Sequence, residues 1–479
     1  MNYVIQGRRP ASVFRFFEEI SAIPRGSYHE EAIADYLVRF AEKRGLECYR
    51  DAANNVLIRK SATPDRANAE PILFQGHTDM VCEKNGNVEH DFLRDPLELY
   101  VEGDLLRARG TTLGADDGIA VAMMLALLEG EIPSHPAYEC LFTTAEEVGL
   151  DGARAFDYSK IAARRMINLD SEELGVVTAG CAGGVRSDLT LSYVAEPFAG
   201  DAIRVELTGL MGGHSGGDIN SGRANANRLM GRLLAELTEK TEARLVSLAG
   251  GSKDNAIPRE CVAVLAVRDV ARSQDILTEA AVRLSAELSA EDRGFRLSVE
   301  ECEPEASMLS SKDTERAVAA LTCAQIGVLE MSKQAKGLVE YSRNLGVVRQ
   351  EEGKLTFVFS SRSSMENQLD ATQRELDLFA KMLGGTVRHH SRYPGWSYAA
   401  SSPLRSAYCE AYLAVTGETA TVNVIHAGLE CGIIYSHLPD MDMISVGPTM
   451  HDIHSPNEAL ELSATETFWR VLERMIEKL

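Results

Sequence analysis

The stretch PILFQGHTD, residues 71–79, places two side chains that can bind a metal directly after a short apolar run. Pro71–Gly76 lies between chain breakers and is typical of a buried strand, so His77 and Asp79 stand at its carboxyl end. Further along, Ile119–Leu128 is apolar on every side, which indicates a buried helix or, less readily, a strand. Strands alternating with helices in this way predict an α/β fold, with a mainly parallel sheet and helices on both faces.

The hydrophobic pattern of the sequence changes near residue 187, and the earlier pattern returns near residue 396. Segments such as Ala202–Thr208 alternate apolar and polar residues, as half-exposed strands do, and helical patterns lie between them. After Tyr393–Trp396 the pattern of buried strand and helix returns. We therefore expect an α/β domain made of residues 1–186 and 397–479, interrupted by an inserted α+β domain of residues 187–396. A chain of 479 residues is long enough for two or three domains.

Composition excludes several classes of protein. The net charge of −22 is spread along the chain, which argues against nucleic acid and anionic membranes as partners. The longest uncharged apolar run, Ile119–Leu128, is too short to span a bilayer. The first residues, MNYVIQGRRPASVF, lack the apolar core of a signal peptide. Nine scattered cysteines without a CxxC pair fit a reducing compartment, so we expect a cytoplasmic protein.

Five short segments concentrate histidine and carboxylate side chains. They are Gly76–Asp79, Gly114–Gly118, Ala145–Gly149, Asn168–Ser171 and His451–Glu458. The first four follow an apolar strand or precede a buried helix, and the carboxyl ends of parallel strands share one edge of a sheet. Folding would therefore bring these four together. Histidine and carboxylate without cysteine suit Zn²⁺, Mn²⁺ or Co²⁺.

Each segment also has an ordinary explanation when taken alone. An HxD histidine is commonly a solvated loop residue, and Asp116–Asp117 could cap the helix that follows. Glu146–Glu147 could be a solvated turn pair. Five such segments in one chain would be a large coincidence, so the metal site is the better interpretation.

The order of GHTDMV, GADDG, EEVG, NLDSEE, GGHSG and HSPNE resembles the M20 metallopeptidases, and within them most closely the bacterial aminoacyl-histidine dipeptidases. The resemblance covers essentially the whole chain. It implies a catalytic α/β domain with two metal ions, a lid domain inserted in it, and a homodimer joined through the lids. The implied substrates are unblocked dipeptides, Xaa-His among them.

The resemblance also implies a set of metal ligands. His77 and Asp170 would bind one ion, and Glu147 and His454 would bind the other. Asp116 would bridge the two. The ions would be Zn²⁺, with Co²⁺ or Mn²⁺ as alternatives.

Two further residues would assist the metals by the same resemblance. Asp79 would orient His77, and Glu146 would be the general base that takes a proton from the attacking water and delivers it to the leaving amine. The family pattern HSPxE selects His454 over the nearby His451 as the ligand.

The resemblance assigns three lid residues to the substrate. His214, in a glycine-rich loop, would be an oxyanion donor that reaches the active site of the other subunit, although a flexible loop histidine is the ordinary interpretation. Asn255 and Arg362 would hold the C-terminal carboxylate, for which an arginine fork is well suited. The segment His426–Glu430 is a pocket candidate without an assigned role.

Three functions remain open at this point. The first is a dipeptidase, and the second is another M20 hydrolase, such as an N-acyl amino acid deacylase or a carboxypeptidase-like enzyme. The third is a non-catalytic scaffold that kept the fold. The same ligands would serve both kinds of hydrolase, and the long two-part lid favours the dipeptidase.

Overall fold

The computed structural model describes residues 3–333 and 337–479, which divide into two units. Unit 1 comprises Met1–Cys181, Trp396–Val424 and Leu429–Leu479, and unit 2 comprises Ala182–Gly395 and Ile425–Gly428. The chain therefore leaves unit 1 five residues earlier than the sequence pattern suggests, and a short segment near residue 426 belongs to unit 2.

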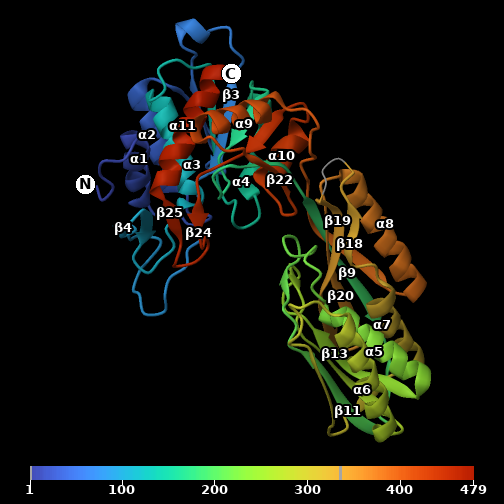
Figure 1. The fold of residues 1–479 in the computed structure, drawn as a ribbon. Coiled ribbons are helices and arrows are strands. Elements are labelled where there is room, and N and C mark those ends of the chain that lie inside the picture. The colour runs from blue at the N-terminus through green and yellow to red at the C-terminus, as the bar shows by residue number, and fades with distance from the viewer. Residues whose placement is uncertain (1–2, 334–336) are drawn as a thin grey trace. The chain divides into compact units, whose positions relative to one another are not determined.

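Unit 1 is built around an eight-stranded sheet (Figure 1). In sheet order its strands are β1 (Glu47–Arg50), β2 (Val56–Lys60), β6 (Tyr138–Thr143), β3 (Ile72–His77), β7 (Arg165–Asn168), β23 (Asp442–Ser445), β8 (Val176–Cys181) and β22 (Thr421–Ile425). The four central strands, β6, β3, β7 and β23, are parallel, whereas β1, β2 and β8 pair antiparallel. The α/β fold is confirmed, with its parallel strands at the centre of the sheet.

Helices cover this sheet because alternate strand residues point to opposite faces. The helices of unit 1 are α1 (Ala11–Ser21), α2 (Glu31–Arg44), α3 (Ala115–Glu129), α4 (Asp151–Ala155), α9 (Pro403–Thr416), α10 (Glu430–His437) and α11 (Leu462–Lys478). One core contains Phe74 and Phe142 from the sheet together with buried residues of α1, α2, α3, α9 and α11. On the opposite face Leu73 and Leu141 are buried too.

Helix α3 lies at the centre of this core. Its residues from Ala115 to Leu128 are all buried, which explains why its sequence has no polar face. Two short 3₁₀ helices (Pro64–Arg66 and Tyr158–Lys160) and a small sheet complete unit 1. The small sheet contains β24 (Met450–His451), β25 (Ala459–Glu461), β5 (Leu105–Ala108) and β4 (Leu99–Glu102).

Unit 2 is an α+β unit with a largely antiparallel sheet. In order the strands are β16 (Arg296–Glu301), β11 (Asp201–Thr208), β15 (Cys261–Val267), β13 (Ala243–Gly250), β19 (Val339–Glu351), β20 (Lys354–Ser363), β9 (Gly183–Ser192) and β21 (Thr386–Tyr393), and β18 (Gly327–Met331) also pairs with β19. Two small pairs join β10 (Ala195–Pro197) to β17 (Ser307–Leu309) and β12 (Gly213–His214) to β14 (Ala256–Ile257).

Four helices lie on one face of the unit 2 sheet (Figure 1). They are α5 (Ala226–Lys240), α6 (Val270–Glu287), α7 (Ser311–Cys323) and α8 (Glu366–Leu383). Leucines on their inner sides, such as Leu233 of α5 and Leu376 of α8, join the sheet residues Phe357 and Phe359 in a second hydrophobic core. Unit 2 therefore has a core of its own.

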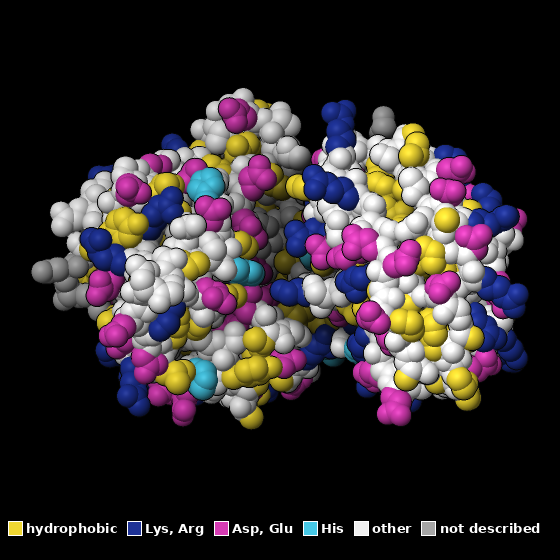
Figure 2. Space-filling view, turned by 90° about the horizontal axis from the view of Figure 1, so that it is seen from below, with side chains coloured by type: hydrophobic (Ala, Val, Ile, Leu, Met, Phe, Trp, Pro, Cys, Tyr) yellow, Lys and Arg dark blue, Asp and Glu magenta, His cyan; other side chains and the backbone are white. Residues whose placement is uncertain are grey.

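Charges of both signs are interspersed on the face shown in Figure 2, where lysine and arginine side chains alternate with aspartate and glutamate side chains on both units. Among the described residues no helix is long and apolar enough to pass through a lipid bilayer.

Candidate active site

Three neighbouring strands bring the predicted ligand segments of unit 1 together. His77 is the last residue of β3, while Glu146 and Glu147 follow β6, and Asp170 follows β7. These three strands are adjacent and parallel, so their carboxyl ends lie at the same edge of the sheet. Asp116 reaches this edge from the first turn of α3.

Asp116 lies between two histidines and offers one carboxylate oxygen to each. Its Oδ1 is 3.0 Å from Nε2 of His77, and its Oδ2 is 3.1 Å from Nε2 of His454. Asp170 completes the first side, with Oδ1 at 3.7 Å from Nε2 of His77. Glu147 completes the second, with Oε1 at 3.0 Å from Nε2 of His454. A carboxylate shared in this way is the geometry expected of a bridging ligand.

These side chains form three overlapping sets that could hold a cation. The ligand atoms of each set lie within 4.8 Å of one another, and the sets are His77–Asp116–Asp170, Asp116–Glu147–His454 and His77–Glu146–Glu147. Histidine nitrogens and carboxylate oxygens are suitable donors for Zn²⁺, Mn²⁺ or Co²⁺. The donor set therefore fits two divalent cations that share Asp116.

The charges of the cluster favour cations as well. Burial raises the pKa of Asp170 well above its ordinary value, and the carboxylate of Asp117 adds to the effect. Burial also raises the pKa of Glu146 to about 8, and neighbouring carboxylates contribute. For Asp116 burial acts in the same direction, but hydrogen bonds from the two histidines hold its pKa below the ordinary value. Several acids packed at one buried point are stabilised by positive charge.

Asp79 holds His77 and the glutamate loop in place. Its backbone oxygen and its Oδ1 lie 3.1 and 3.3 Å from Nδ1 of His77, which leaves Nε2 of that ring free to face Asp116. Its two carboxylate oxygens also accept the backbone N–H groups of Glu146 (3.1 Å) and Glu147 (3.3 Å). One buried carboxylate thus orients a histidine and the two glutamates together.

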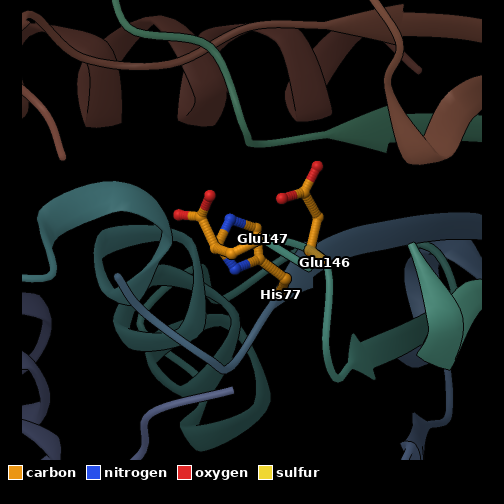
Figure 3. Close-up of side chains that lie close together, drawn as sticks. All are labelled: His77, Glu146 and Glu147. Atoms are coloured by element: carbon orange, nitrogen blue, oxygen red, sulfur yellow. The ribbon is translucent and has the colours of Figure 1, made fainter. Parts of the chain in front are cut away.

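Glu146 and Glu147 have different surroundings although they are adjacent. Figure 3 shows their carboxylates diverging from the same loop. Oε1 of Glu147 lies 3.0 Å from Nε2 of His454, whereas burial raises the pKa of Glu146 to about 8. A carboxyl group whose pKa lies near neutrality is well matched to proton transfer.

The structure separates the two candidate histidines of the last segment. His454 faces Asp116 and Glu147, and hydrogen bonds to these two carboxylates raise its pKa to about 10. His451 is exposed, and its Nε2 lies 2.7 Å from Oε1 of Glu461. Only His454 therefore contributes to the ligand cluster.

A second group of polar residues occupies unit 2. Burial lowers the pKa of His214, and the positive charge of Arg362 contributes. Arg362 on β20 is buried; its Nη1 donates to the Tyr393 hydroxyl (2.8 Å), and its Nε has no hydrogen-bond partner among the described residues. Asn255 joins the group through its backbone, whose oxygen accepts the Ser215 N–H (2.8 Å). Arg362 supplies the positive charge of this group.

Two features of the structure had no role assigned from the sequence. His426 had no assigned role, but burial and the charges of Arg362 and His214 lower its pKa to about 3, which places it in the unit 2 group. Its Nε2 lies 2.7 Å from Oγ of Ser342. Residues 25–30, before α2, also reach the ligand loops, and they were not singled out from the sequence.

The chain is similar to known peptidases. Residues 73–478 match the model of peptidase family M20/M25/M40. The chain is 37% identical over 481 residues to the cytosol non-specific dipeptidase of Escherichia coli (strain K12), and the match covers 98% of each protein. The crystal structure of aminoacylhistidine dipeptidase from Vibrio alginolyticus is similar with a TM-score of 0.94 and 36% identity, covering 99% of this chain and 97% of that one. The aminopeptidase PepT of Bacillus cereus shares the fold alone, with a TM-score of 0.55 and 16% identity over 98% of this chain and 99% of that one.

Proposed function

Because the chain belongs to peptidase family M20/M25/M40, we propose that it is a metal-dependent dipeptidase, which hydrolyses unblocked dipeptides and includes Xaa-His among its substrates. The observation that carries the proposal is the shared carboxylate of Asp116, whose two oxygens face two separate histidines. The likeness to two dipeptidases over nearly the whole chain supports the choice of substrate.

In this proposal His77 and Asp170 hold one metal ion, and Glu147 and His454 hold the other, with Asp116 shared. Zn²⁺ is the proposed metal, and Co²⁺ or Mn²⁺ would suit the same donors. When bound, the two ions would lower the pKa of a water molecule and polarise the scissile carbonyl.

The chain's own side chains would move the proton and hold the geometry. Glu146 would accept the proton of the attacking water and deliver it to the leaving amine, a role that suits a pKa of about 8. Asp79 would keep His77 and the glutamate loop oriented through the contacts described above.

Unit 2 would recognise the substrate. We propose that Arg362 and Asn255 bind the C-terminal carboxylate, and the unpaired buried Nε of Arg362 supports this role. His214 would donate to the developing oxyanion. Recognition of the terminal carboxylate would favour dipeptides over longer chains.

Assembly and location complete the proposal. Residues 187–396 would act as a lid and dimerisation domain between the two parts of the catalytic domain, 1–186 and 397–479. The protein would be a cytoplasmic homodimer joined through the lids, with His214 serving the partner's active site.

The test is a substrate screen with defined metals. Protein treated with a chelator and then supplied with Zn²⁺, Mn²⁺ or Co²⁺ is assayed on dipeptides, tripeptides and N-acyl amino acids. We expect rapid hydrolysis of unblocked dipeptides, loss of that activity in Glu146→Gln, and little hydrolysis of the other two classes. Preference for N-acyl amino acids would favour a deacylase, cleavage of longer peptides would favour a carboxypeptidase, and no hydrolysis of any substrate would favour a scaffold.

A further inference from the structure

Three buried side chains contact the backbone of the ligand loops and are not themselves ligands: Arg25, Glu30 and Glu458. Arg25, between α1 and α2, is 1% exposed. Its Nη1 donates to the backbone oxygens of Thr78 (3.0 Å) and Asp79 (3.2 Å), and its Nη2 donates to the backbone oxygen of Gly114. One guanidinium therefore ties the loop after β3 to the turn before α3.

Glu458 binds the same turn as an acceptor, whereas Arg25 binds it as a donor. It is 2% exposed and accepts four consecutive backbone N–H groups with its two oxygens. Oε2 accepts those of Leu113 (2.7 Å) and Gly114 (3.0 Å), and Oε1 accepts those of Ala115 (2.8 Å) and Asp116 (3.3 Å). The backbone of the bridging aspartate is thus fixed by a carboxylate.

The third ligand loop is held by the segment that contains Arg25. Oε1 of Glu30 accepts the backbone N–H of Ala145 (2.8 Å), immediately before the two glutamates. The Ser27 hydroxyl donates to Oδ2 of Asp79 (2.8 Å). Residues 25–30 and Glu458 together contact the three loops that carry His77, Asp116 and Glu147.

Two glycines, Gly114 and Gly118, pack closely against the guanidinium of Arg25. At Gly114 the backbone has φ +64°, and a Cβ would lie 2.5 Å from Nη2 of Arg25. At Gly118 a Cβ would lie 2.6 Å from the same atom. A buried charge is costly unless it is fully hydrogen-bonded, and charge-assisted bonds to several backbone groups meet that requirement.

We infer that Arg25, Glu30 and Glu458 are positioning residues, which set the metal affinity of the centre by fixing the backbone of its three ligand loops. The inference rests on the proposed function. Because Asp116 would be shared by both ions, Glu458 has the largest influence. Changes to groups that orient metal ligands typically weaken metal binding about 10- to 100-fold.

Two glutamine substitutions separate positioning from general stability. Glu458→Gln places an amide N–H₂ against backbone N–H groups, so we expect Zn²⁺ affinity to fall about 10- to 100-fold in competition with a chromophoric chelator. Glu139, 3% exposed near the start of β6, is a matched control that accepts the N–H groups of Ala162 (3.0 Å) and Ala163 (2.9 Å). Glu139→Gln should lower the melting temperature and leave Zn²⁺ affinity within about twofold.

Glu30 provides an internal comparison. It accepts a single loop N–H, which the carbonyl of glutamine can also accept, so Glu30→Gln should change Zn²⁺ affinity much less than Glu458→Gln. The visible spectrum of the Co²⁺-loaded Glu458→Gln protein should differ from that of the parent. If Glu458→Gln does not fold, Arg25→Lys tests the hydrogen bonds that Arg25 donates to the same turn. This variant should also weaken Zn²⁺ binding, because one ammonium group cannot replace the several donors of a planar guanidinium.

The outcomes distinguish this inference from the proposed function. A parent protein that binds no divalent metal would overturn both. A parent that binds metal and hydrolyses dipeptides, with unchanged affinity in Glu458→Gln or in its substitute Arg25→Lys, would overturn the positioning role alone. Equal weakening in Glu139→Gln would do the same, since the effect would then follow from stability.

Discussion

Glu430 should make the stability of the protein depend on pH in a defined direction. It is the first residue of α10 and is 0% exposed, and its Oε2 accepts hydrogen bonds from Nε2 of Gln75 (2.5 Å) and Oγ1 of Thr143 (2.6 Å). Burial raises the pKa of Glu430 to about 7 from its ordinary value of 4.5. Between about pH 4.5 and 7 this carboxyl group is therefore protonated in the folded protein and ionised in the unfolded chain.

The size of the effect follows from the two pKa values. A difference of about 2.5 pH units corresponds to about 3 kcal/mol, at 1.36 kcal/mol for each unit. This stabilisation is fully present below about pH 4.5 and is lost progressively as the pH rises through about 7. For a unit of this size, about 3 kcal/mol corresponds to a change of about 6–12 °C in melting temperature.

Glu430→Gln isolates this contribution because glutamine has a similar shape and does not ionise. Melting temperatures of the variant and the parent are compared at steps from pH 4.5 to 8, with a chelator present so that only side-chain charges surround residue 430. As the pH rises through this range, we expect the melting temperature of the variant to increase by about 6–12 °C relative to that of the parent. A difference between the two proteins that stays constant with pH would refute the reasoning.

Four further predictions concern the metals, the base and the lid. Chelation should abolish dipeptide hydrolysis and added Zn²⁺, Mn²⁺ or Co²⁺ should restore it; full activity in metal-stripped protein would contradict a two-metal centre. Glu146→Ala should retain its metal and lose about 10²–10⁴-fold in rate, whereas Glu147→Ala should lose metal by elemental analysis. The reverse pattern would exchange their roles. Arg362→Ala should raise KM for dipeptides, and also lower kcat if the grip orients the bond, yet change little for a C-terminally amidated substrate; equal losses on both would exclude the carboxylate grip. Mixed His214→Ala and Glu146→Ala protomers should regain partial activity by subunit exchange, and no recovery after confirmed exchange would argue against a shared site.

The central sheet and the ligand cluster were predictable because their signals are local. The sequence shows directly the apolar run before His77 and the unbroken apolar run Ile119–Leu128. Strands β13 and β15 of unit 2 were not predicted. Most of β15, Cys261–Val267, is buried in the middle of the sheet, so its sequence lacks the alternation that marks half-exposed strands.

The supports of the site could not be predicted in the same way. Arg25 and Glu458 are charged, and charged residues are usually at the surface, so their burial depends on contacts between distant parts of the chain. The division of the Asp116 oxygens between His77 and His454 also depends on packing, since 338 residues separate Asp116 from His454. Sequence patterns therefore predict the candidate metal ligands, whereas the residues that support the ligand loops become apparent only in the tertiary structure.

The discontinuity of unit 1 has a consequence for the order of events during synthesis. Strand β23, residues 442–445, pairs in parallel with β7, residues 165–168, and the whole of unit 2 is translated between them. Domains tend to fold as units as the chain emerges from the ribosome, from the N-terminus onward. Unit 2 can therefore acquire its core while unit 1 still waits for its later strands. His454 and Glu458 are translated after the whole of unit 2, so a chain that stops before them would carry the acidic loops without the complete ligand cluster.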